Sequence, residues 1–84
     1  MNTLEAIINV CTEYKLEKFE IEEFQSRLES VLVSDEYKQM VSKSLLEATN
    51  KLEEIRFCEL ESDFRKYGEV VADVLLNEVD KIGL

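Results

Sequence analysis

The chain has 84 residues, which suits one domain, and its 45% hydrophobic content is typical of a folded globular protein. It contains no proline, and its two glycines are Gly68 and Gly83, so the many tight turns of a small all-β fold are excluded. Nineteen acidic residues against ten basic ones, with no histidine, give a net charge of −9. Such a field repels phosphate backbones and anionic lipids, so we expect no direct binding to nucleic acids or membrane surfaces.

The first apolar stripe predicts a helix over about residues 3–16, and Asn2 and Glu5 have the spacing of a capping box at its start. This stripe consists of Leu4, Ile7, Ile8, Cys11 and Tyr14. A change of phase predicts a second helix over about 20–32, with a stripe of Ile21, Phe24, Leu28, Val31 and Leu32. No glycine or proline marks the break between these helices, and we expect Phe19 to pack back across it.

Ser34 with Asp35 and Glu36 favours the start of a third helix, over about 35–57. Its near-heptad stripe is Tyr37, Val41, Leu45, Ala48, Leu52 and Ile55. We expect Ser62 to cap a fourth helix, over about 62–82, with the stripe Phe64, Tyr67, Val71, Val74, Leu75, Val79 and Ile82. Gly83 follows its end, while Gly68 lies inside it and either allows close packing or marks a bend.

Four amphipathic helices with short connections can bury their stripes only against one another, which predicts a single all-α domain over residues 1–84, folded as an antiparallel four-helix bundle. The amino-terminal stretch has no basic leader, and no apolar run approaches the ~20 residues that span a bilayer. We therefore expect a cytoplasmic protein in which Cys11 and Cys58 are reduced and packed.

The residues that most catalytic sites need are missing from the sequence. Without histidine there is no imidazole base and no histidine ligand for zinc, and the two cysteines do not form a CxxC pair. No glycine-rich phosphate-binding loop occurs. Paired carboxylates such as Glu53 and Glu54 are expected to face solvent, where a carboxyl group keeps its ordinary pKa. The sequence thus predicts no enzyme, no catalytic residue, no metal and no cofactor.

Two runs of the sequence concentrate acidic residues, one at residues 17–23 and one at 53–63, and the second is the stronger candidate for a binding surface. Its acids are Glu53, Glu54, Glu59, Glu61 and Asp63, with Arg56 as the one base among them. Phe57 and Leu60 interleave with the acids, and an apolar anchor ringed by carboxylates suits a basic protein partner. The alternative is that Phe57 and Leu60 plug the end of the bundle and that the acids are merely solvated.

Three segments, FEIEEFQSRLESVL, LLEATNKLEEIRFCELESDF and YGEVVADVLLNEV, give the chain a layout that resembles small acidic helical immunity proteins of bacteria. This group includes the colicin D immunity-like and contact-dependent inhibition immunity proteins. The resemblance implies an inhibitor that covers the active site of a basic nuclease toxin with carboxylates in place of substrate phosphates. By this resemblance, Glu53, Glu54, Glu59, Glu61 and Asp63 would be the phosphate mimics.

Two functions are therefore expected, and they differ in oligomeric state. The first is an immunity protein or antitoxin that binds a basic nuclease domain and is itself a monomer or a weak homodimer. The alternative is a helical interaction module or homodimer with no role in toxin inhibition. Its self-pairing face would be the seam of the third helix, made of Val41, Leu45, Ala48, Leu52 and Ile55.

Overall fold

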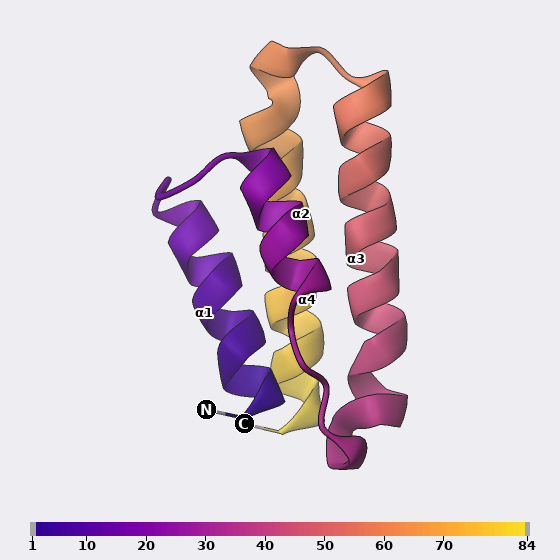
Figure 1. Ribbon diagram of the computed structural model, residues 1–84. Helices are drawn as coiled ribbons and strands as arrows, with labels where there is room; N and C mark the ends of the chain where they lie inside the picture. Colours follow the sequence, from indigo (N-terminus) through magenta and orange to yellow (C-terminus); the bar gives the residue numbers. More distant parts are fainter. Residues whose placement is uncertain (1, 84) are drawn as a thin grey trace.

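The apolar stripes form helices that pack antiparallel to one another in the computed structural model, which describes residues 2–83 (Figure 1). The helices are α1 (Thr3–Lys15), α2 (Ile21–Glu29), α3 (Lys38–Cys58) and α4 (Phe64–Ile82). Two short 3₁₀ turns, η1 (Asp35–Tyr37) and η2 (Glu61–Asp63), precede α3 and α4. No strand occurs in the described part of the chain, so the predicted all-α four-helix bundle is confirmed.

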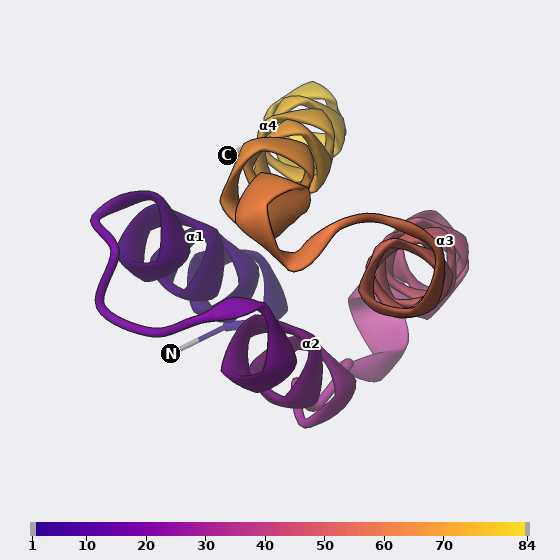
Figure 2. The ribbon, with the colours of Figure 1, turned by 90° about the horizontal axis from the view of Figure 1, so that it is seen from above.

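Seen from above, the helices stand at the corners of a quadrilateral, with α1 and α3 at opposite corners (Figure 2). The main packing contacts join α3 to α4, α1 to α4, α2 to α3 and α1 to α2. The connection between α3 and α4 extends beyond the ends of the shorter α1 and α2, while the start of α1 and the end of α4 lie at the opposite end of the bundle (Figure 1). The α3–α4 connection is therefore covered by neither of the other two helices.

All four helices contribute their stripes to one apolar core. Its buried members are Leu4, Ile7, Cys11, Tyr14, Phe19, Ile21, Phe24, Leu28, Val41, Leu45, Ala48, Leu52, Ile55, Val71, Ala72, Leu75 and Val79. The predicted capping box at Asn2 and Glu5 is also present, with the Glu5 amide donating to Asn2 Oδ1 at 2.8 Å. Burial raises the pKa of the Cys11 thiol to about 12, because the apolar surroundings disfavour the thiolate.

The end of α1 explains how the chain turns without glycine or proline. The Lys18 amide donates to the Glu13 carbonyl at 3.1 Å, and the Glu17 amide donates to the Tyr14 carbonyl at 2.9 Å. These two bonds define a Schellman motif, and its left-handed position is taken by Glu17 with φ of 62° instead of the usual glycine. The turn delivers Phe19 into the core, as predicted, where its ring centroid lies 6.2 Å from that of Tyr14.

Gly68 permits a close approach between α4 and α1. A Cβ atom at this position would lie 2.1 Å from the hydroxyl oxygen of Tyr14. Tyr14 is fully buried, with its ring stacked on Phe24 at a centroid distance of 4.1 Å, so its hydroxyl has little freedom to move away. The sequence left open whether Gly68 allows close helix packing or marks a bend, and the structure supports close packing.

The boundaries of the predicted helices need three corrections. α2 ends at Glu29 instead of 32, since the Ser30 hydroxyl bonds back to the Ser26 carbonyl at 2.9 Å and the chain then runs extended. Leu32, which was assigned to the buried stripe, is 90% exposed. Its carbonyl instead accepts a hydrogen bond from the Thr3 hydroxyl at 3.1 Å, which fastens this connection to α1.

The third and fourth helices also begin later than predicted. Neither Ser34 nor Ser62 caps an α-helix through its side chain. Ser34 precedes η1 and its amide donates to the Thr3 hydroxyl, whereas Ser62 lies inside η2. Each helix thus starts from a 3₁₀ turn, a common way to satisfy the free amides of a first turn.

Candidate protein-binding surface

The seven residues predicted to bind a partner lie at the α3–α4 end of the bundle. Glu53, Glu54 and Phe57 belong to the last two turns of α3, Glu59 is its carboxy-terminal cap residue, and Leu60 leads into η2, which contains Glu61 and Asp63. We refer to residues 57–63 as the tip. The backbone of this end extends past α1 and α2, so neither helix lies beside it (Figure 1).

Both apolar residues of the tip are open to solvent. Phe57 is 79% exposed and Leu60 is 71% exposed, although each is a large hydrophobic side chain. The alternative in which they plug the end of the bundle is therefore wrong. Exposed apolar side chains are unremarkable when they occur singly, but two within four residues at a protruding end form a small apolar patch.

The carboxylates around this patch are largely free of internal partners. In the described part of the chain, Glu54 is the one acid of the run that forms an ion pair, with Lys51 at 3.1 Å. Arg56, the one base in the run, donates to Gln25 Oε1 at 2.8 Å and so is directed toward α2. The negative charge of Glu53, Glu59 and Glu61 is therefore not neutralised within the described structure.

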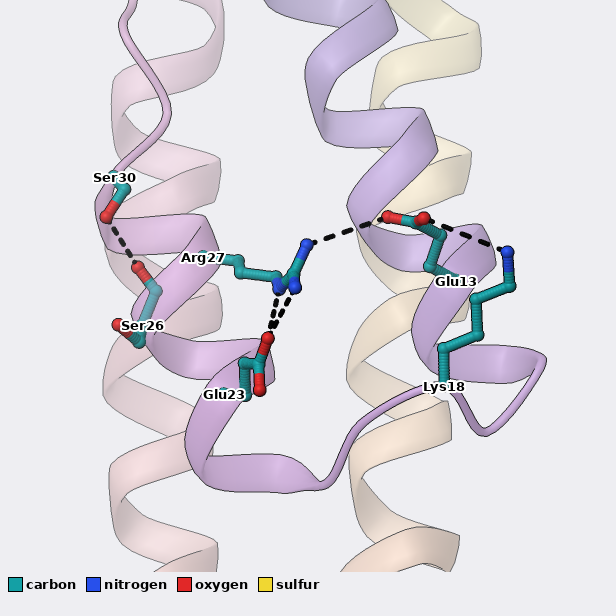
Figure 3. A network of polar contacts seen from close by, with 6 residues as sticks. All are labelled: Glu13, Lys18, Glu23, Ser26, Arg27 and Ser30. Carbon is teal, nitrogen blue, oxygen red and sulfur yellow. Dashed lines mark hydrogen bonds and ion pairs between the residues drawn. The ribbon is translucent and has the colours of Figure 1, made fainter.

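The first acidic run is arranged differently, as Figure 3 shows. The Arg27 guanidinium donates to Glu23 Oε2 at 2.7 Å and lies 3.9 Å from Glu13 Oε1. Lys18 lies 3.9 Å from the other oxygen of Glu13. Arg27 also lies over the ring of Phe19, with 4.4 Å from its Cζ to the ring centroid. Glu23 of the first run thus has an arginine partner, and the same arginine joins α2 to Glu13 of α1.

Arg65 of α4 also binds the connection between α1 and α2. Its guanidinium donates to the Tyr14 carbonyl at 2.5 Å and to the Phe19 carbonyl at 2.8 Å, and it lies 3.3 Å from Glu20 Oε1. It also lies 4.2 Å from the ring centroid of Tyr14. This role could not be predicted from the sequence, because Arg65 is 46 and 51 positions away from the carbonyls that it binds.

The two cysteines have different environments. Cys11 is buried as predicted, whereas Cys58 at the end of α3 is exposed, so the expectation that both are packed is wrong for Cys58. Both are free thiols, in agreement with the prediction that they are reduced. Cys58 belongs to the tip and lies between Phe57 and Glu59 in the sequence.

The near-heptad seam of the third helix is used within the chain. Val41, Leu45, Ala48, Leu52 and Ile55 are all buried in the core. A second copy of the chain could reach this seam only if the bundle opened. The seam therefore provides no free surface for the homodimer considered above.

A groove between α3 and α4 was not anticipated from the sequence. It has a volume of about 390 Å³ and is lined by Ser44, Glu47, Ala48, Lys51, Ile55, Tyr67, Val70, Val71, Val74, Leu75 and Glu78. Val74 was predicted to be buried with the stripe of α4, but it is 56% exposed on the wall of this groove. The one sequence signal was Ala48, a small residue between Leu45 and Leu52 in the stripe of α3.

Residues 2–83 lack two features that would indicate a metal site or a membrane span. They contain no group of three or more histidine, cysteine, aspartate or glutamate side chains that could hold a metal ion. None of their helices combines the length and apolar character needed to cross a membrane.

No protein-family model, curated protein or solved structure matches this chain. The tip and the groove are therefore the features on which a function can be based.

Proposed function

We propose that this chain is a cytoplasmic, non-catalytic inhibitor that binds a basic nuclease domain through its tip, as the helical immunity proteins that it resembles would. The observation that carries the proposal is the exposure of Phe57 and Leu60 beside Glu59, Glu61 and Asp63 in the sequence, three acids that form no ion pair within residues 2–83. Within the tip, the residues that would imitate substrate phosphates are Glu59, Glu61 and Asp63. They lie at alternate positions along the connection between α3 and α4.

The chemistry of such a surface favours a cationic partner. A carboxylate accepts charge-assisted hydrogen bonds from arginine and lysine much as a phosphate does, so a cluster of them fits a site built for a phosphate backbone. The apolar pair supplies the contact area that charge alone does not, since aromatic and aliphatic anchors dominate the energetics of most interfaces. The net charge of −9 would also speed the encounter with a basic protein at low salt.

We expect inhibition to weaken strongly when Glu53 and three acids of the tip are neutralised; this combination is called the tip variant. The variant combines Glu53→Gln, Glu59→Gln, Glu61→Gln and Asp63→Asn, and the matched control combines Glu17→Gln, Glu22→Gln, Glu36→Gln and Asp35→Asn on other parts of the surface. Both remove the same four charges, and none of these eight residues forms an ion pair within the described structure. We expect the tip variant to lose affinity by on the order of 100-fold and the control to change it by less than about fivefold.

The measurement begins with capture of proteins from the native host on the immobilised chain, at low and at high salt. The captured protein is then assayed as a nuclease, with and without a stoichiometric amount of each variant. A basic nuclease that is inhibited by the wild-type chain and by the control, but not by the tip variant, supports the proposal. Equal loss in both variants, or a captured partner without nuclease activity, contradicts it, and the second result favours a general interaction module.

A further inference from the structure

The groove between α3 and α4 is apolar along its floor and walls. Ile55, Val71 and Leu75 form buried parts of its lining, while Val70 and Val74 are each 56% exposed along α4. Figure 2 shows α3 and α4 standing side by side along one edge of the bundle, with α1 and α2 on the other side. The groove is thus a second surface, distinct from the tip, at which apolar side chains meet solvent.

The hollow has a simple origin in the sequence. Among the α3 residues that line the groove, Ala48 is the small one in the apolar stripe, whereas the neighbouring stripe positions carry Leu45 and Leu52. The small side chain leaves space that a leucine would fill. The lining residues of α3 run from 44 to 55, about three turns or roughly 17 Å of helix. That length accommodates an apolar stripe spaced i, i+3, i+4 and i+7 on another helix.

The charges that line the groove are negative once internal pairing is considered. Glu47 and Glu78 both line it, and Lys51 is the one base among the lining residues. The ammonium group of Lys51 is already held by Glu54 at 3.1 Å, and Glu78 Oε1 lies 3.9 Å from Lys81 Nζ. Glu47 forms no ion pair within the described structure, so it leaves the lining with an unpaired negative charge. A second copy of the chain would bring another charge of −9 against this face, which disfavours a homodimer here.

We propose that the α3–α4 groove binds the apolar face of a basic amphipathic helix supplied by a partner protein. The occupant places aliphatic side chains over Val70, Val74 and Ala48. Its lysine or arginine residues lie at the rim, within reach of Glu47 and Glu78. This binding mode buries valine surface that is now exposed, which is favourable because apolar area leaves water. The surface and the ligand class are independent of the nuclease proposed for the tip.

The test uses a synthetic helical peptide of about 14 residues, with leucine at i, i+3, i+4 and i+7 and lysine at most other positions. A peptide of the same composition with the leucines scrambled, and one with glutamate in place of lysine, are the controls. Binding to the isotope-labelled chain is followed through amide chemical shifts at about 0.15 M salt. We expect saturable one-to-one binding of the patterned basic peptide, with shifts concentrated in residues 44–55 and 67–78.

Two matched variants separate docking from simple charge attraction. Val74→Asp places a charge in the groove, and Leu32→Asp places the same charge on an apolar residue that is exposed outside it. Each makes the chain more acidic, so a purely electrostatic association would become tighter in both. We expect Val74→Asp to weaken binding by at least about tenfold and Leu32→Asp to leave it within about twofold. Circular dichroism of both variants confirms that the bundle remains folded.

Three results would overturn the inference. The scrambled peptide could bind as tightly as the patterned one, the glutamate peptide could bind as well as the lysine peptide, or shifts could appear at the tip while the groove stays unchanged. Sedimentation of the chain alone gives a further outcome. A dimer that Val74→Asp dissociates would mean that a second copy occupies the groove, contrary to the proposal. Because no native partner is used, this test can fail while the proposal for the tip succeeds, and the reverse also holds.

Discussion

The α1–α2 junction and the tip are both acidic connections that contain a phenylalanine, yet they have opposite structures. At the junction, Phe19 is buried and arginines from α2 and α4 bind its acids and carbonyls. At the tip, Phe57 is exposed and no arginine within residues 2–83 forms an ion pair with the acids. An acidic run thus becomes a structural element or a free surface according to which cations the fold brings to it. Local composition alone does not decide this.

The largest expected effect comes from removing the two phenylalanine rings in turn. Phe19→Ala should lower the free energy of unfolding by about 3 kcal/mol, because it leaves a cavity in the core. Phe57→Ala should change it by no more than about 0.5 kcal/mol, because the ring is 79% exposed. Urea denaturation followed by circular dichroism measures both. Similar losses in the two variants would mean that the tip is packed like the junction.

The next effect concerns the arginine that closes the junction. Arg65→Met should lower the free energy of unfolding by about 2 kcal/mol, since the Phe19 carbonyl loses its charged donor and Glu20 loses its ion pair. Arg56→Met, at the tip end, removes one hydrogen bond to Gln25 and should cost about 1 kcal/mol or less. Thermal denaturation of both variants makes the comparison. An Arg65 variant as stable as the wild-type chain would show that the arginine does not hold the junction.

The smallest effect is a gain in stability. Glu17→Gly should raise the free energy of unfolding by about 0.5 kcal/mol, because glycine adopts the left-handed conformation at φ 62° without the strain of a side chain. The same substitution at Glu22, in the first turn of α2, should instead lower it by about 0.5–1 kcal/mol. We expect parallel urea titrations to show that the two substitutions change the free energy of unfolding in opposite directions. If both substitutions destabilise the chain, the Schellman turn is not strained.

The fold was largely predictable because each helix carries an apolar stripe of helical period, and these stripes became the core. The ends of the helices were less predictable than the helices themselves. Glutamate in place of glycine at the turn after α1 removed the usual signal, and two 3₁₀ turns displaced the expected serine caps. Exposure at the tip was not predictable, since a residue such as Leu60 fits either a plug or a patch. Only the projection of α3 and α4 beyond their shorter neighbours decides between the two.

Cys58 gives the chain a built-in attachment point for a reporter group. Its thiol is exposed in the tip, while Cys11 is buried and its pKa is raised to about 12, so a maleimide dye at neutral pH would modify one position in the native sequence. A polarity-sensitive fluorophore placed there sits beside Phe57 without any mutation. Its emission would report directly on whether that end of the molecule becomes covered, and by what.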